Sequence, residues 1–189
     1  VGQLKSLDVS KNTNLTYLNV RNNKLTSLDV SNNVKLETLD VSYNQLTSLK
    51  LPSASSNKLE SLNVGDNKLT SLDVSKNVKL TELYVASNQL TSLDVSKNPK
   101  LTSLDAYNNQ LTSLDVSKNT NLTDLSISDN KLTSLDVNKN PKLTSLHAAN
   151  NQLTILEVSK NTNLKYLSVD DNQLTSLDVS KNVKLEELY

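Results

Sequence analysis

Leucine and valine return along the chain at a fixed spacing, with polar residues between them. The pattern LxxLxVxxN occurs first as Leu15, Leu18, Val20 and Asn23, and again from Leu25 onward. Apolar and polar residues alternate around Leu18 and Val20, which is the period of two expected for a strand with one buried face. Asparagine-rich turn residues follow each run. Each half is therefore predicted to be a short strand that ends in a bend.

The two halves form a 21-residue unit that is copied along the whole chain. Copies begin at Leu15, Leu36, Leu59, Leu80, Leu101, Leu122, Leu143 and Leu164. The step is 23 residues only between Leu36 and Leu59, where residues 50–56 replace the usual bend and form either a tolerated surface insertion or a contact loop. A single unit cannot bury its own apolar face, so stacked units must share one core. The period predicts a solenoid whose backbone hydrogen bonds run between coils as a parallel ladder.

We expect a single domain over residues 1–189. It divides into partial repeat 1–14, full repeats 15–35, 36–58, 59–79, 80–100, 101–121, 122–142, 143–163 and 164–184, and partial repeat 185–189. Because Val1 enters in mid-repeat, we expect this chain to be part of something longer or to be built from repeats. No polar cap covers either end coil, so end-to-end self-association is also expected.

The repeated segment from Leu15 to Leu25 resembles the leucine-rich repeat signature LxxLxLxxNxL, and all eight full copies carry the match. The 21-residue step and the second half LTSLDVSKN are similar to the bacterial cell-surface class typified by internalin J, which is also common in secreted Bacteroidetes proteins. The resemblance implies a curved right-handed array of short parallel strands and turns, with little or no helix. It also implies a binding module of an extracellular or cell-surface adhesin-like protein, with its ligand on the concave strand face.

This chain differs from that class at one inward strand position, which is often a cysteine in the class. Here it holds Val20, Val41, Val64, Val85, Ala106, Ile127, Ala148 and Val169. The chain is therefore either a cysteine-free relative or a version from which cysteine was removed. Two rows of asparagine, which include Asn109 and Asn119, are predicted to be structural, because an inward amide can satisfy backbone groups of its own and the adjacent coil.

Composition narrows the possible functions. Twenty basic and twenty acidic residues cancel, so no overall field attracts nucleic acid or an anionic membrane. No apolar run is long enough to span a bilayer, and we expect no targeting signal in this segment. His147 is the sole histidine and there is no cysteine, so we expect no catalytic site, no metal site and no cofactor.

The first halves differ between coils, whereas the second halves are almost uniform. All six tyrosines lie in first halves. Because tyrosine supplies contact area at low entropic cost, this face is predicted to bind a protein or carbohydrate ligand. The candidate residues are Tyr17, Arg21, Tyr43, Glu82, Tyr84, Asp105, Tyr107, Asp124, His147 and Tyr166. The alternative is an engineered or consensus-like scaffold with no natural ligand, in which these are merely acceptable solvent-facing strand residues.

Overall fold

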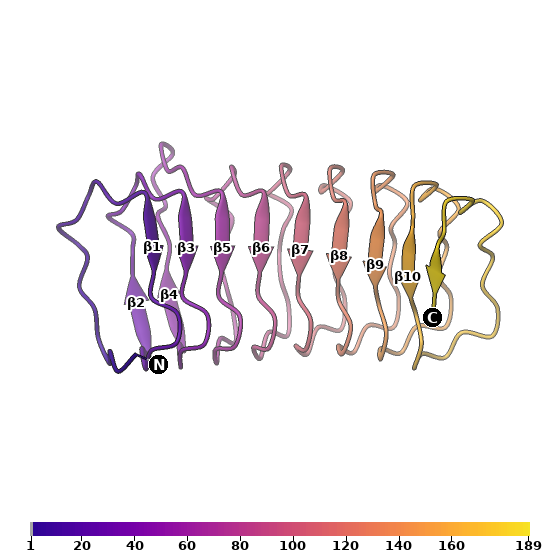
Figure 1. Ribbon diagram of the computed structural model, residues 1–189, viewed down its shortest axis with the longest axis horizontal. Helices are drawn as coiled ribbons and strands as arrows, with labels where there is room; N and C mark the ends of the chain where they lie inside the picture. The colour runs from indigo at the N-terminus through magenta and orange to yellow at the C-terminus, as the bar shows by residue number, and fades with distance from the viewer. Residues whose placement is uncertain (1) are drawn as a thin grey trace.

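The computed structural model describes residues 2–189 as one solenoid in which each first half contributes a short strand (Figure 1). These strands are β1 (Tyr17–Asn19), β3 (Thr38–Asp40), β5 (Ser61–Asn63), β6 (Glu82–Tyr84), β7 (Ser103–Asp105), β8 (Asp124–Ser126), β9 (Ser145–His147), β10 (Tyr166–Ser168) and β11 (Glu187–Leu188). They form a nine-stranded sheet in chain order. No helix occurs among residues 2–189. The predicted fold class is confirmed.

Every pair in this sheet is parallel and keeps one register. The central leucines face each other across the ladder, as Leu83 does with Leu104. The ladder continues one residue beyond the strands, since the Val85 amide donates to the Asp105 carbonyl at 2.8 Å. Because each coil bonds to the next at equivalent positions, the outward side chains of these strands form straight columns. We call this surface the strand face.

The core is one continuous stack of leucine and valine between the two halves of each coil. Most first-half leucines, such as Leu83 and Leu125, are fully buried. At the inward position after the central leucine, where the resemblance to the internalin J class led us to expect cysteine, Ala106, Ile127 and Ala148 are also fully buried. A large side chain between two small ones keeps this layer filled, which close packing requires. No coil has a core of its own, as the repeat predicted.

The expectation of a second strand in every coil is wrong. Within residues 2–189, second halves form strands only at β2 (Ser27–Asp29) and β4 (Ser48–Lys50), which pair with each other. Further along, adjacent second halves are separated by hollows, such as one of about 410 Å³ that Leu93, Asp94, Leu114 and Asp115 help to line. The nine-stranded sheet therefore runs along all the coils, whereas in the described part of the chain the second halves contribute only a two-stranded sheet.

Both asparagine rows bind backbone, as predicted, but in different ways. In the first row, Asn109 Nδ2 donates to three carbonyls of its own and the preceding coil, and its Oδ1 accepts the Leu90 amide at 3.0 Å. In the second row, Asn119 Nδ2 donates to the carbonyls of Val95 and Asn98. Its buried Oδ1 accepts no hydrogen bond from residues 2–189. The second row therefore acts through its donors alone.

The 23-residue coil is accommodated without a break in the sheet. Thr38 and Ser61 pair across the insertion in the same register as every other coil. In the next coil, Asn77 Nδ2 bonds to the Pro52 carbonyl and to Asn57 Oδ1 instead of the usual two carbonyls. Asn57 itself donates to the Ala54 and Lys76 carbonyls. One added amide thus repairs the asparagine row where the bend is longer.

Candidate functional site

A sharp turn follows each strand and determines which side chains reach the edge of the strand face. The residue before each first-row asparagine has a positive φ, between 52° and 59°. The residues at this left-handed position are Asn22, Tyr43, Asp66, Ser87, Asn108, Asp129, Asn150 and Asp171. Asparagine and aspartate tolerate this conformation because their short polar side chains bond locally. The turn presents two side chains per coil beside the carboxyl end of the strand.

The strand face and this edge are acidic, although the whole chain is neutral. The acidic side chains there are Asp40, Asp66, Glu82, Asp105, Asp124, Asp129, Asp170, Asp171 and Glu187. The one basic side chain at these positions is Arg21. The compensating lysines lie elsewhere on the coils, so the molecule has a negative field on its strand face. A surface of this kind favours a partner with a basic patch.

A hollow of about 570 Å³ lies at the edge of the strand face, from the turn after β3 to the turn after β7. We call it the tyrosine hollow. Its lining includes Tyr43, Gly65, Tyr84, Ala86, Asp105 and Tyr107, which come from four successive coils. A volume of this size falls within the range of about 300–1,000 Å³ that ligand pockets occupy.

Two small residues form the floor of the hollow. Gly65 and Ala86 stand where neighbouring coils carry Ser42 and Tyr107. Gly65 has no positive φ, so its backbone does not require glycine. A Cβ there would lie 3.2 Å from Asn63 Oδ1, a tight contact with a side chain rather than with backbone. The missing side chains, and not the course of the backbone, therefore create the hollow.

The hydroxyl groups of Tyr84 and Tyr107 stay protonated at neutral pH, because both pKa values are raised. Burial raises the pKa of Tyr84 above its usual 10.0, and nearby Glu82 and Asp105 raise it further. Hydrogen bonding to Asp129 raises the pKa of Tyr107. The Tyr84 hydroxyl lies 3.3 Å from Glu82 Oε2. Asp105 Oδ1 accepts the Tyr107 amide at 3.0 Å, which fixes the carboxylate toward the hollow. The site thus combines neutral aromatic walls with carboxylates.

The predicted site residues fall into three groups along the strand face. Tyr43, Tyr84, Asp105 and Tyr107 line the tyrosine hollow, and Glu82 bonds to the hydroxyl of one of them. Near the C-terminal end, the ring centroids of His147 and Tyr166 lie 4.4 Å apart, and those of Tyr166 and Tyr189 lie 5.6 Å apart. Tyr17 and Arg21 lie at the N-terminal end on β1 and the turn after it. Asp124, on β8, lies between the first two groups.

Two of the predicted site residues, Asp124 and His147, do not line the hollow. Sequence reasoning also missed Gly65, Asp66 and Ala86, which do. The signal was present in the sequence: Gly65 is the only glycine apart from Gly2, and it comes directly before a small residue in the next coil at the same position.

Within residues 2–189, the side chains in contact with the His147 ring are a serine and a tyrosine. Ser145 Oγ lies 3.1 Å from His147 Nε2, and the other partner of the imidazole is the Tyr166 ring. A triad also needs a carboxylate that orients the histidine. Within residues 2–189 no group of three or more histidine, cysteine, aspartate or glutamate side chains is placed to hold a metal ion.

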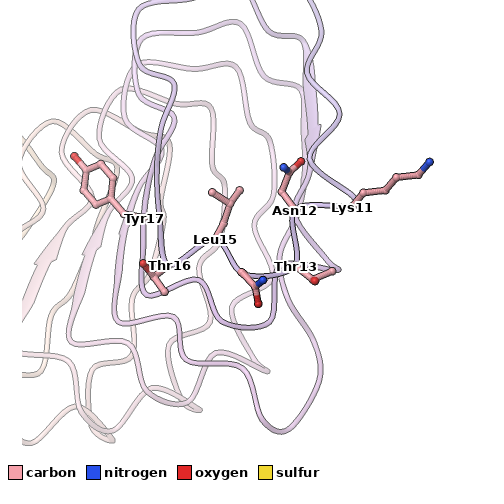
Figure 2. A pocket seen from close by; sticks show the side chains of 7 residues that line it. Lys11, Asn12, Thr13, Leu15, Thr16 and Tyr17 are labelled. Carbon is pink, nitrogen blue, oxygen red and sulfur yellow. The ribbon is translucent and has the colours of Figure 1, made fainter.

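A second hollow, of about 450 Å³, opens at the N-terminal end of the solenoid (Figure 2). It is lined by residues 11–17, and the half-buried Leu15 and the exposed Tyr17 both belong to it. This hollow is the open side of an end coil, where β1 has a sheet neighbour on one side only. Its shape follows from coil stacking and not from a special set of side chains.

Comparison with known families matches most of the chain. A model described as "Leucine Rich repeats (2 copies)" matches residues 13–53, 34–77 and 78–119, and a model described as "Leucine Rich repeat" matches 118–137 and 160–181. The chain belongs to the leucine-rich repeat family. No curated protein matches its sequence.

Three solved leucine-rich repeat structures are similar over almost the whole chain. The functional domain of InlJ from Listeria monocytogenes, described as including a cysteine ladder, is 36% identical over 98% of this chain and 46% of its own, with a TM-score of 0.75. The internalin InlF from the same organism is 26% identical over 99% and 58%, with a TM-score of 0.88. YopM, a leucine-rich effector protein from Yersinia pestis, is 28% identical over 96% and 50%, with a TM-score of 0.79.

The present chain thus spans about half the length of these relatives. It contains no cysteine, in contrast to the ladder of the InlJ domain. No helix capable of crossing a bilayer occurs in the described part of this leucine-rich repeat chain.

Proposed function

We propose that this leucine-rich repeat chain is a protein-recognition module whose partner binds the strand face around the tyrosine hollow. The observation that carries the proposal is the contrast between the two sides of each coil. The second halves repeat one sequence, whereas the first halves vary and contain every tyrosine. The variable side also holds the hollow and the acidic surface. Aromatic anchors in central hollows commonly carry most of the binding energy of a protein interface.

Similarity to the internalins InlJ and InlF supports a place on the surface of a bacterium or among its secreted proteins. The similarity to the effector YopM is consistent with a protein that acts outside the cell that makes it. In this setting the partner is an extracellular or host protein. We favour a protein over a carbohydrate because the hollow presents carboxylates and rings at its edge, which complement basic side chains.

A display library of extracellular protein domains, selected on the purified chain, tests this function. Binders should lose at least tenfold in affinity for the double variant Tyr84→Ala/Tyr107→Ala. The matched control, Asp94→Ala/Asp115→Ala on the opposite face, should bind as the unchanged chain does. Thermal unfolding would establish that both variants are folded. If no binder depends on the two tyrosines, the proposal is wrong, and the alternative of a scaffold without a natural ligand gains support.

A further inference from the structure

Tyr43 occupies a backbone position that suits tyrosine poorly. Its φ is 56°, and every other residue at this left-handed position is asparagine, aspartate or serine. A bulky side chain in this region is strained, and strain of this kind gathers at functional sites. Tyr43 is nevertheless half exposed, so its ring adds little to the core. Its effect is to place an aromatic wall at the margin of the tyrosine hollow.

The Tyr43 ring already holds a guanidinium group. Arg21 Cζ lies 5.7 Å from the ring centroid, which is within the range of a cation–π contact. The rings of Tyr84 and Tyr107, on the other side of the hollow, have no such partner among residues 2–189. The Tyr84 and Tyr107 rings can therefore make a cation–π contact with a ligand in the hollow.

Carboxylates complete a site for a cation. Asp66 and Asp105 line the hollow, and no lysine or arginine does. Asp105 uses only Oδ1, for the Tyr107 amide. The Asp66 carboxylate makes no hydrogen bond within residues 2–189, so both of its oxygens can accept from a ligand. An acidic or phosphorylated group would be repelled by the same carboxylates.

We propose that the tyrosine hollow binds an arginine side chain of the partner protein, and this inference rests on the protein-recognition function proposed above. Arginine fits better than lysine for two reasons. Its planar guanidinium stacks on an aromatic ring, as Arg21 does on Tyr43, and its fork of donors matches a carboxylate such as Asp66.

A nuclear magnetic resonance titration tests the inference directly. The probes are acetyl-Gly-Arg-Gly-amide and the same peptide with citrulline, which keeps the shape of arginine without its charge. The reporter is the backbone amide of Gly65, on the floor of the hollow and one of only two glycines in the chain. The arginine peptide should shift this resonance saturably, and citrulline should bind at least tenfold more weakly. Equal shifts with both peptides, or no shift with either, would overturn the proposal.

A pair of matched variants locates the binding. Ala86→Lys places an ammonium group in the hollow and should weaken the arginine peptide at least tenfold. Ala149→Lys makes the same change at the equivalent repeat position, three coils further on, and should leave binding unchanged. Both alanines are half-buried, so the two variants carry similar folding risk. Equal losses in the two variants would mean that a general charge effect operates, and the hollow would not be the site.

The domain selection separates this inference from the function on which it rests. Binders that depend on Tyr84 and Tyr107 but tolerate replacement of all their surface arginines would retain the protein-recognition function and refute the arginine site. Other binders would lose tenfold in affinity for the unchanged chain when one of their own arginines is replaced. If that replacement has no effect on their binding to the Ala86→Lys variant, the result supports both proposals.

Discussion

The backbone amide of Leu90 donates to Oδ1 of Asn109, one coil further along the chain, at 3.0 Å. The same asparagine donates to the carbonyls of Val85, Ala106 and Tyr107, so one side chain joins two coils through four hydrogen bonds. Both Leu90 and Asn109 are buried. Water cannot replace these bonds without opening the core.

Replacing Asn109 by alanine should therefore lower the free energy of unfolding by about 1–3 kcal/mol, because buried backbone groups lose their partners. Replacing the surface residue Lys118 by alanine should cost well under about 1 kcal/mol. Urea denaturation of the two variants measures both effects. Comparable losses would contradict the structural role of the first asparagine row.

Relief of strain at Tyr43 should have opposite effects on stability and binding. The variant Tyr43→Asn places a tolerated residue at φ 56° and should raise the free energy of unfolding by about 0.5–1 kcal/mol, after the small loss of the Arg21 contact. The same variant should weaken the arginine peptide. As a control, Tyr107→Asn removes a ring from the hollow at a residue without positive φ, and should give no gain in stability. A loss of stability in Tyr43→Asn would show that the tyrosine conformation is not strained.

Acid should destabilise the second halves through their aspartates. Hydrogen bonds from Ser96 and Ser117 lower the pKa values of Asp94 and Asp115 below the usual 3.8 in the folded chain. The two aspartates therefore bind protons more readily in the unfolded chain than in the folded one. Their contribution to stability is fully present above pH 3.8 and is lost as the pH falls through their lowered pKa values in the folded chain.

The double variant Asp94→Asn/Asp115→Asn keeps a side-chain oxygen for each turn and removes the titration. Its urea midpoint should fall less than that of the unchanged chain between about pH 6 and about pH 3. Identical pH dependence in the two proteins would assign acid sensitivity to other carboxylates.

The two end coils should promote self-association of the 189-residue chain. Leu4 at one end is 44% exposed, Val183 and Leu188 at the other are 83% and 48% exposed, and β1 and β11 each have one sheet neighbour. Sedimentation velocity should show association that rises with concentration and weakens in Leu188→Lys. The control Ile155→Lys changes a hydrophobic residue that is 75% exposed but lies on the second half of an interior coil. A monomer at all concentrations, or equal effects of both variants, would refute end-to-end contact.

The alternation around residues such as Leu83 and Val85 was enough to predict the strands, the parallel ladder and the shared core. It could not predict the fate of the second halves. Leu93 and Val95 have the same spacing, but whether they join a ladder depends on how far apart adjacent coils are held, which no single unit encodes. For the same reason, the unpartnered Oδ1 of Asn119 was not expected.

The candidate site was predictable in its tyrosines and not in its shape. Tyr84 and Tyr107 are conspicuous in the sequence, whereas Gly65 and Ala86 matter because of the side chains that they lack. Tyr43 joins them from a turn two coils before Tyr84, and the residues meet only because the register is constant. A hollow defined by absent atoms in stacked coils needs coordinates to be recognised.

Thr38 pairs with Ser61 in the usual register although the bend between them is longer. During evolution or design, the length of a bend can therefore change without a change in the order of the strands. Residues can be added in a bend away from the nine-stranded sheet while the spatial order of the side chains on the strand face stays fixed. Segment length and surface pattern can thus vary independently. The bend at residues 50–56 should accept a further insertion, such as a tag or a second recognition loop, while the side chains that line the tyrosine hollow keep their spacing.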